Sequence, residues 1–347
     1  MSNTVQELFE SWLKEQKDSF SGVFSVSNSS GVIYTRAGGY RSKAEELPNT
    51  GETMFGIASG TKLFTGLAVC KLLDEKKLAL EDKLCDLLSN DLGKTDKDIT
   101  VYQLLTHTSG VGDYIDEEAD DADEQLQNLY NKYPVQLWER LEYYMQMIID
   151  LPPKFKPGER YGYSNSGYIL LGLVIEAVSG VPYQQFVHDK IIAPCDLKRT
   201  GFYRADSLPA NTALGYIQDE DTQTWRTNTF SLPIVGGSDG GLYTNAEDLD
   251  KLWRAIFSYE ILSQEMTGAF LKSYITIDED DDSEESYGLG VYIYNSGGKQ
   301  AYFAVGGDSG VGFCTAYYPV TETVISCFSN TGWLRFYDLI DKLLSIF

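Results

Sequence analysis

The hydrophobic pattern of this chain has a strand-like period at both ends and a helical period between them. Near the N-terminus, residues 22–27 and 32–37 alternate around a turn at residues 28–31, which predicts a β-hairpin. Four more strands are predicted in the last quarter of the chain: Tyr287–Tyr294, Gln300–Val305, Val311–Tyr318 and Thr323–Ser329. Strands grouped at both ends of a helical block are typical of an α+β fold. We therefore expect one antiparallel sheet built from both chain ends and flanked by helices.

The helices expected around and between these strands follow a period of 3.6 residues. They cover residues 1–20, Thr61–Glu75, Asp82–Ser89, Thr100–Leu105, Pro134–Ile149, Asn165–Val178, Ala246–Phe257 and about 334–346. With 347 residues, the chain is longer than a typical single domain. We predict a discontinuous sheet domain formed by residues 1–70 and 235–347, a mostly helical domain formed by residues 71–234, and an active site between them.

The net charge of the chain excludes several classes of partner. At a formal charge of −23, the protein repels phosphate backbones and anionic membrane surfaces, so we expect no nucleic-acid partner. Fifteen of the 51 acidic residues lie in two runs, Asp113–Glu124 and Asp278–Glu285, which we interpret as solvated loops. The second run begins like an EF-hand loop, but Ser283 and Leu289 stand where that loop needs Gly and Glu.

Few residues are suited to metal or disulfide chemistry. The chain has only two histidines, His107 and His188, so a di-zinc site built on several imidazoles is excluded. Its five cysteines form no C-x-x-C pair, and their odd number cannot make a closed disulfide framework. We expect no metal and free, mostly buried thiols, which favours a reducing compartment. We expect His107 to bind local backbone at a helix-to-loop corner and His188 to be partly exposed in a helix.

The N-terminal segment has neither the apolar core nor the small-residue cleavage site of a signal peptide. No stretch approaches about 18 uninterrupted apolar residues, so no membrane span is expected. The sequence predicts a cytoplasmic protein, with an extracytoplasmic form that has lost a leader as the alternative. The expected partner is a small-molecule or peptide substrate, and the oligomeric state stays open.

Three serines lie in patterns that are typical of nucleophiles. Ser238 lies in a G-x-S-x-G pattern, but an α/β-hydrolase needs a histidine after this serine, and none follows His188. Ser309 lies in a G-D-S-G pattern of trypsin-like proteases, whose nearly all-β fold conflicts with the predicted helices. Ser59 begins a predicted helix, and Lys62 follows it on the same face. The helix N-terminus supplies N–H donors for an oxyanion, and a lysine with a lowered pKa can act as the base.

Four ordered segments resemble the serine β-lactamase-like superfamily, which includes class C β-lactamases, D-alanyl-D-alanine peptidases and related esterases. The segment from Ser59 to Lys62 is similar to the first motif, and residues 104–110 (LLTHTSG) resemble a second conserved stretch. Residues 163–165 match the Tyr-x-Asn motif, and residues 240–242 resemble the Gly-Gly-Leu segment before a late helix. The resemblance spans about residues 20–335 and implies a β-lactamase/transpeptidase-like fold.

The resemblance also implies an acyl-enzyme mechanism. Ser59 would attack a carbonyl, and Lys62 would take its proton. Tyr163 would share the base role or protonate the leaving group, if adjacent cations lower its pKa. Asn165 would bind the substrate amide or orient Lys62. The backbone N–H groups of Ser59 and of Val311, on an edge strand, would hold the oxyanion. No cofactor is implied.

The chain departs from the superfamily at the third motif, which is Lys or His, then any residue, then Gly. The nearest candidate is Asp308-Ser309-Gly310, and a shift of one or two residues would place Gly306 or Gly307 there instead. Either alignment removes the cation that meets a substrate carboxylate. A charge-assisted hydrogen bond of this kind contributes about 1.5–3 kcal/mol.

We therefore predict an esterase- or peptidase-type serine hydrolase rather than an efficient β-lactamase. If the first acidic run borders the cleft, neutral or cationic substrates are favoured. A penicillin-binding protein, a D-Ala carboxypeptidase or a β-lactamase is one alternative. A non-catalytic binding protein that retains the fold is another.

Overall fold

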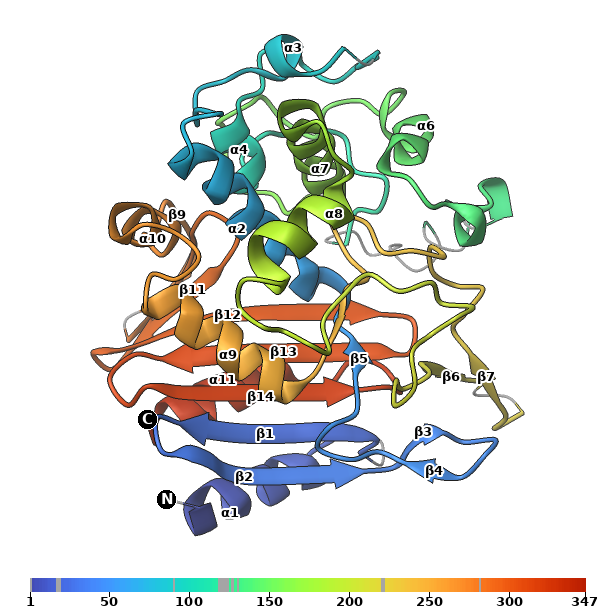
Figure 1. The fold of residues 1–347 in the computed structure, drawn as a ribbon, viewed down its shortest axis with the longest axis vertical. Coiled ribbons are helices and arrows are strands. Elements are labelled where there is room, and N and C mark those ends of the chain that lie inside the picture. The colour runs from blue at the N-terminus through green and yellow to red at the C-terminus, as the bar shows by residue number, and fades with distance from the viewer. Residues whose placement is uncertain are drawn as a thin grey trace.

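A single antiparallel sheet combines strands from both ends of the chain, as predicted (Figure 1). The computed structural model describes residues 2–16, 20–89, 91–117, 125, 128–129, 131–219, 222–280 and 282–347. The strand order is β2-β1-β14-β13-β12-β11-β10-β9. Their bounds are β1 Gly22–Asn28, β2 Gly31–Gly38, β9 Ile275–Glu279, β10 Ser283–Tyr287, β11 Tyr292–Ser296, β12 Lys299–Asp308, β13 Val311–Tyr318 and β14 Thr323–Ser329. Because β1 pairs with β14, with Gly22 opposite Ser329, the N-terminal hairpin extends the C-terminal strands.

Helices cover both faces of this sheet. Helices α1 (Ser2–Lys14) and α11 (Phe336–Leu344) share one apolar cluster with inward-facing residues of the strands, including Phe24. Helices α2 (Thr61–Asp74) and α9 (Ala246–Phe257) contribute to the larger cluster on the other face, together with Val23. Strands β13 and β14 bury every residue, since both of their faces are covered.

The remaining helices lie mostly in the part of the molecule above the sheet in Figure 1. They are α3 Leu84–Leu87, α4 Val101–Leu105, α6 Met145–Ile148, α7 Asn165–Ser179, α8 Tyr183–Val187 with a π-helical turn at His188–Ile192, and α10 Gln264–Phe270. Helix α7 is nearly all buried; Ser164 caps its first turn by accepting the N–H of Gly167 at 3.0 Å. Gly180 ends it with φ +76°, in the left-handed region that favours glycine.

Three short strand pairs connect these parts. They are β3 Tyr40–Ser42 with β4 Leu47–Pro48, β5 Phe55–Gly56 with β8 Tyr243–Thr244, and β6 Tyr216–Gln218 with β7 Trp225–Thr227.

Two predicted helices are wrong in extent. The segment 82–89 contains only the short helix α3. The segment 134–149 is broken into two 3-10 turns, η2 Val135–Leu137 and η3 Leu141–Tyr144, followed by α6. The break occurs where Trp138 and Arg140 adopt extended backbone angles, and the buried Trp138 ring packs edge-on against Tyr144 at 5.1 Å. Tertiary packing of a large aromatic side chain overrides the helical period here.

One predicted strand is also wrong, because Tyr287–Tyr294 contains a turn. Strand β10 ends at Tyr287, and β11 begins at Tyr292. Between them, Gly290 has φ +114° and lies against α2, where an added Cβ would come within 2.8 Å of Gly66 Cα. A close approach of two backbones therefore replaces the continuous strand.

The second acidic run is a β-hairpin in its described part, so the predicted loop was wrong, but residues 278–280 and 282 are exposed to solvent, as predicted. It spans the end of β9 and most of β10, with Glu285 opposite Asp278. Burial together with the nearby Asp278 carboxylate raises the pKa of Glu285 to about 7. Because Asp and Glu are poor strand formers, their composition favoured a loop, and the packing of the hairpin decided otherwise.

The cysteines match the prediction: all five are free thiols, and only Cys85 is exposed. The division of the chain at residues 70 and 235 stays a prediction. Within the described part of the chain, no single helix is long and apolar enough to cross a membrane. The pair Asn165–Ser179 and Tyr183–Ile192 reaches the required length and hydropathy only when its two helices are taken together, and they are bent by 76° relative to each other.

Candidate active site

Ser59 lies in a tight 3-10 turn, η1 (Ala58–Gly60), directly before α2. Ala58, the residue before it, has φ +44°, a left-handed conformation that is strained for a residue with a Cβ. The carbonyl of Ala58 accepts the Thr61 hydroxyl at 2.7 Å and the Gly241 N–H at 3.3 Å. These contacts hold the turn in place, so Ser59 is presented at a fixed position at the start of the helix.

Lys62, the second residue of α2, is buried one turn after Ser59, and its ammonium group donates three hydrogen bonds. Its Nζ donates to Ser59 Oγ at 3.0 Å, to Asn165 Oδ1 at 2.7 Å and to the carbonyl oxygen of Asp239 at 2.7 Å. Burial lowers the pKa of Lys62, and nearby carboxylates, that of Asp239 first, oppose this shift. The geometry thus holds the amine against Ser59 and makes its neutral form more accessible.

Tyr163 completes the contacts of Ser59. Its hydroxyl donates to Ser59 Oγ at 2.8 Å, and Lys62 Nζ lies 4.8 Å from its ring centroid. Burial, with the Glu117 carboxylate nearby, raises the pKa of Tyr163 well above its ordinary value, and the hydrogen bond with Ser59 only partly offsets this. The condition set for Tyr163, that adjacent cations lower its pKa, is therefore not met. A phenol that stays protonated can donate a proton but is a poor base.

Asn165, the first residue of α7, links Lys62 to the first acidic run. Its Oδ1 accepts from Lys62, its Nδ2 donates to Glu117 Oε1 at 2.7 Å, and its backbone N–H donates to Asp113 Oδ2 at 2.8 Å. Asp113 Oδ1 accepts the next N–H, that of Ser166, at 2.9 Å. The start of the run borders the site, and its interpretation as a solvated loop was wrong for Asp113; residues 118–124 lie outside the described part.

Three groups of this network were not assigned to the site from the sequence, although the first acidic run was considered as a border of the cleft: Asp113, Glu117 and Asp239. Asp239 contributes its backbone carbonyl to Lys62, and its carboxylate accepts a hydrogen bond from the Tyr114 hydroxyl. It is the neighbour of Ser238, whose pattern suggested a nucleophile; instead the carbonyl of Ser238 accepts a hydrogen bond from Thr65. The only sequence signal was position, since Asp113 follows the LLTHTSG stretch and Asp239 precedes the Gly-Gly-Leu stretch.

His107 binds backbone, as predicted, but the backbone of the distant Ser164 rather than that of its own corner. It is buried, its backbone has φ +56°, and its Nδ1 accepts the N–H of Ser164 at 3.1 Å. Burial lowers the pKa of His107 well below its ordinary value, so the ring is neutral. It therefore fixes the stretch that leads into α7. His188 is more than half exposed at the start of the π-helical turn, which confirms its prediction.

Strand β12 runs beside Ser59, and Gly306 is its point of closest approach. An added Cβ on Gly306 would lie 2.1 Å from the Ile57 carbonyl oxygen and 2.9 Å from the backbone nitrogen of Ser59. Gly306, not Gly310, is therefore the glycine that the strand needs here, and the two residues before it, Ala304 and Val305, are apolar. The alignment of Asp308-Ser309-Gly310 with the third motif was displaced, but its conclusion that no cation stands there holds for either alignment.

The other residues of that candidate motif form the end of β12 and the turn into β13. Asp308 Oδ1 accepts the N–H of Ser309 at 2.7 Å, and the Ser309 carbonyl accepts Asn228 Nδ2 at 2.9 Å. Gly310 has φ +70° and packs against the backbone of Tyr216. Val311 follows as the first residue of β13, one strand further from Ser59 than β12 at this point.

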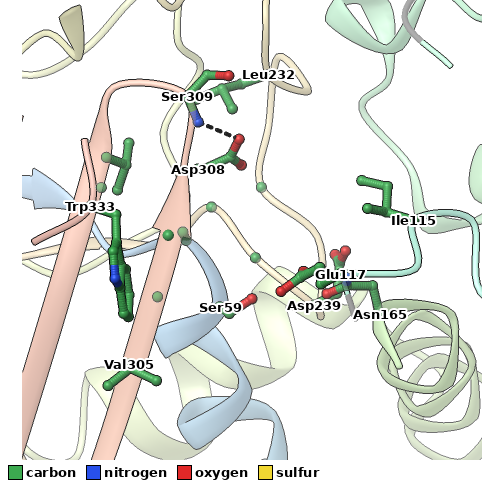
Figure 2. Close-up of a pocket in the computed structure, with 18 of the residues that line it drawn as sticks. Ser59, Ile115, Glu117, Asn165, Leu232, Asp239, Val305, Asp308, Ser309 and Trp333 are labelled. Atoms are coloured by element: carbon green, nitrogen blue, oxygen red, sulfur yellow. Dashed lines mark hydrogen bonds between the residues drawn. The ribbon is translucent and has the colours of Figure 1, made fainter. Parts of the chain in front are cut away.

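Ser59 faces a cavity of about 770 Å³ whose walls are aromatic and acidic (Figure 2). Among the described lining residues are four carboxylates, Glu117, Asp239, Glu285 and Asp308, and no Lys, Arg or His. The aromatic lining includes Tyr114, Tyr144, Tyr161, Tyr163, Tyr203, Tyr243, Tyr292, Tyr337 and Trp333. Partial desolvation in the cavity raises the pKa of Asp308 to about 7, and the Glu117 and Asp239 carboxylates add to the shift, although the Asp308 side chain is exposed. A cavity with this lining disfavours an anionic ligand.

Comparison with known proteins agrees with this architecture. The sequence matches the beta-lactamase family over residues 6–338. A penicillin-binding protein of Bacillus halodurans is 37% identical, with a TM-score of 0.87, over 99% of this chain and 100% of that one. An octameric penicillin-binding protein homologue of Pyrococcus abyssi is 29% identical, with a TM-score of 0.80, over 95% of this chain and 73% of that one.

Among curated proteins, Penicillin-binding protein 4* of Bacillus subtilis is 28% identical over 75% of this chain and 57% of its own length. Protein flp of Staphylococcus aureus is 28% identical over 72% of this chain and 48% of its own length. The chain thus spans about half the length of these relatives. The family match over nearly the whole chain, with the Ser59–Lys62–Tyr163 geometry, leads to one conclusion: the chain belongs to the beta-lactamase family.

Proposed function

We propose that the protein is a serine hydrolase that cleaves an ester or amide through an acyl-enzyme on Ser59. The observation that carries this proposal is the pair of contacts at Ser59 Oγ, 3.0 Å from Lys62 Nζ and 2.8 Å from the Tyr163 hydroxyl. Both distances are within the range needed for proton transfer, and Ser59 opens onto the large cavity. Members of the family are serine hydrolases, which supports the same class.

In the proposed reaction, Ser59 Oγ attacks the carbonyl carbon while its proton passes to neutral Lys62. Burial of Lys62 supports this role, because it lowers the pKa of the amine. The carbonyl carbon then expels its leaving group, which takes a proton from Tyr163. The Lys62 ammonium group, whose Nζ lies 4.8 Å from the Tyr163 ring centroid, returns this proton to the Tyr163 phenolate directly or through a water molecule, because Ser59 Oγ is now an ester oxygen and carries no proton. Water hydrolyses the acyl-enzyme in a second step.

The oxyanion needs two N–H donors close to Ser59. The N–H of Ser59 itself, at the start of the helical segment, is one. We place the second on β12 beside Gly306 rather than at Val311, because β12 is the strand that lies against Ser59. In this arrangement Asn165 holds Lys62 in position, since its Oδ1 is already engaged by the ammonium group.

The charge of the cavity supports neutral or cationic substrates over carboxylates. The described lining offers four carboxylates and no cationic side chain, and Lys62 is already engaged with three oxygen atoms. A substrate carboxylate would therefore lack the partner that contributes about 1.5–3 kcal/mol in a charge-assisted hydrogen bond. An ester or amide without such a group fits the site better.

A fluorophosphonate probe tests the nucleophile. We expect covalent labelling of the wild-type protein at Ser59, mapped by peptide mass spectrometry, and none in a Ser59→Ala variant. Lys62→Ala should slow the labelling at least 100-fold, because the attack then lacks its base. Undiminished labelling of Ser59→Ala would overturn the proposal.

The names of two relatives, both penicillin-binding proteins, favour a second candidate function, penicillin binding. A fluorescent penicillin distinguishes it, since a penicillin-binding protein would retain the label on Ser59. Because the described cavity lining has no cationic side chain beside β12, we expect the opposite result, weak or no labelling. A non-catalytic binding protein would bind ligand stoichiometrically without releasing product, but the intact contacts of Ser59 favour turnover.

A further inference from the structure

The cleft has two ends along β12, and Tyr163 belongs to the first of them. Its ring centroid lies 4.6 Å from that of His107, which lies 4.9 Å from that of Tyr287 at the end of β10. Tyr287 contacts Tyr292 at 4.6 Å, and Tyr292 on β11 pairs with Phe303 of β12. Tyr163 is therefore connected to the Phe303 end of the strand. Because it is the proposed proton donor, the leaving group departs toward this end.

Asp308 lies at the other end. Ser59 is opposite Gly306, and Asp308 is two residues beyond Gly306, about 7 Å further along the strand and away from Phe303. Residues i and i+2 of a strand share a face, so the side chain of Asp308 is on the face that Gly306 turns to Ser59. Figure 2 shows Val305 and Asp308 at opposite ends of this segment, with Ser59 across from the stretch between them.

The Asp308 carboxylate is held in place and still has an oxygen available. Its Oδ1 accepts the Ser309 N–H at 2.7 Å, and the turn beyond is fixed by the bond from Asn228 to the Ser309 carbonyl. Within the described residues, no hydrogen bond reaches Oδ2, and no Lys, Arg or His forms an ion pair with Asp308. The cavity there is also lined by Tyr243, an aromatic surface that suits a cation.

The other carboxylates near Ser59 also accept one hydrogen bond each, but they lie beside Asn165 rather than on β12 (Figure 2). Glu117 accepts the hydrogen bond from Asn165 Nδ2, and Asp239 accepts the one from the Tyr114 hydroxyl. Glu285 lies on β10, near the Tyr163 end of the cavity. Asp308 is therefore the carboxylate placed to meet the acyl part of a substrate.

We propose that Asp308 selects substrates whose acyl group carries a protonated amine a few atoms from the scissile carbonyl, as an aminoacyl group does. This inference rests on the proposed function, since it assumes that the carbonyl is attacked by Ser59. The carboxylate forms a charge-assisted hydrogen bond with the ammonium group, and a neutral acyl group of the same size leaves that bond unmade. Asp308 is thus a specificity-determining residue and takes no part in the chemical steps.

A matched pair of substrates tests the proposal: alanine p-nitroanilide with a free amine and its N-acetylated counterpart, in both enantiomers. We expect the wild-type enzyme to show a kcat/KM for the free amine of one enantiomer at least tenfold above that for its acetylated form. Asp308→Asn should lower this ratio of kcat/KM values at least tenfold. It should change kcat/KM for the acetylated substrate by less than twofold. Asp308→Lys should reverse the preference, toward an N-succinylated substrate.

Glu285→Gln is the matched control, because it removes a carboxylate from the opposite end of the same cavity. It should leave the ratio unchanged. Equal losses on both substrates in Asp308→Asn, or a wild-type enzyme without preference for the amine, would overturn the assignment.

The acyl-enzyme step can be tested separately with two fluorophosphonates, one carrying an ammonium group and one a neutral group of equal size. Labelling of Ser59 at equal rates by both probes contradicts only the role of Asp308. If neither probe labels Ser59, the proposed function is contradicted, and this inference with it.

Discussion

At the scale of single residues, one ammonium group joins three separate parts of the chain. Lys62 contacts the turn that holds Ser59, the start of α7 through Asn165, and the loop carbonyl of Asp239. Its three donors are all used, so the side chain has one well-defined position. Tyr163 approaches Ser59 from another side as a protonated phenol. In the proposed mechanism their roles differ: Lys62, in its neutral form, accepts the Ser59 proton, and Tyr163 donates one to the leaving group.

Tyr163→Phe tests this difference through the leaving group. An amide nitrogen must be protonated to leave, whereas nitrophenolate leaves without a proton. We expect kcat/KM for an amide substrate to fall about 100-fold or more, and that for the matching nitrophenyl ester to fall less than tenfold. Tyr161→Phe, which removes a neighbouring phenol that has no bond to Ser59, should change neither. Equal losses on both substrates would contradict the role of Tyr163 as proton donor.

At the scale of the elements, the approach of β12 to the Ser59 turn depends on a missing side chain. A methyl group on Gly306 would overlap the Ile57 carbonyl and approach the Ser59 nitrogen. We expect Gly306→Ala to cost about 1–3 kcal/mol of unfolding free energy, because the strand and the turn must move apart. The rate of fluorophosphonate labelling should fall with it. Urea unfolding and a labelling time course measure the two effects.

Gly268→Ala in α10 is the control for that substitution. An added Cβ at Gly268 meets no atom within 4 Å, so alanine should be neutral or stabilise the helix by about 0.5–1 kcal/mol. A loss of labelling in this variant would show that the effect at Gly306 is not local.

The β9–β10 hairpin carries a partly buried carboxyl group, that of Glu285, whose charge depends on pH near neutrality. Glu285 has its pKa raised from 4.5 to about 7, so between these values the folded protein retains a proton that the unfolded chain has lost. Stability therefore falls as pH rises through this window. Glu285→Gln should raise the unfolding free energy at pH 8, on the order of 1–3 kcal/mol, and have no effect near pH 4.5. Glu279→Gln, at an exposed position of β9, should be neutral at both values when unfolding is followed by circular dichroism.

Sequence patterns located these elements well where the fold uses local signals. The bounds of β13 and β14 and the start of α7 were predicted correctly, because their residues are apolar in runs and their ends carry turn or capping residues. Ser59, Lys62, Tyr163 and Asn165 were expected at one site, and the fold brings them together. Asp239 was not predicted for it, because it acts through its carbonyl, and Gly306 was predicted only as an alternative position for the third motif, because it acts through an absent side chain. Neither property is visible before the backbone path is known.

At the scale of the whole molecule, the sheet separates two apolar clusters. The cluster under α1 and α11 contains Trp12, whose indole N–H donates to the Arg335 carbonyl at 3.1 Å. The cluster on the other face contains α2, which begins beside Ser59. We therefore expect packing around Trp12 to change without moving Ser59, although Tyr292 and Val305, which pack against the same cluster, line part of the cavity.

Trp12→Ala tests this separation. Loss of a fully buried indole should cost about 3–5 kcal/mol of unfolding free energy. Below the unfolding transition, kcat/KM should stay within twofold of wild type, because α2 and β12 keep their contacts. Val320→Ala, at an exposed position, should change neither quantity. A fall in kcat/KM that parallels the loss of stability would show that the two clusters are coupled.

The pairing of β1 with β14 has a consequence for biosynthesis. The N-terminal hairpin finds its partner strand only after about 300 further residues have left the ribosome, which at typical elongation rates takes about 15–60 s. During that interval the inner edge of β1 has open backbone donors and acceptors, and an unpaired edge is a template for aggregation. A nascent chain of this topology therefore depends on protection, by a chaperone or by α1 folding over its own hairpin, until β14 emerges.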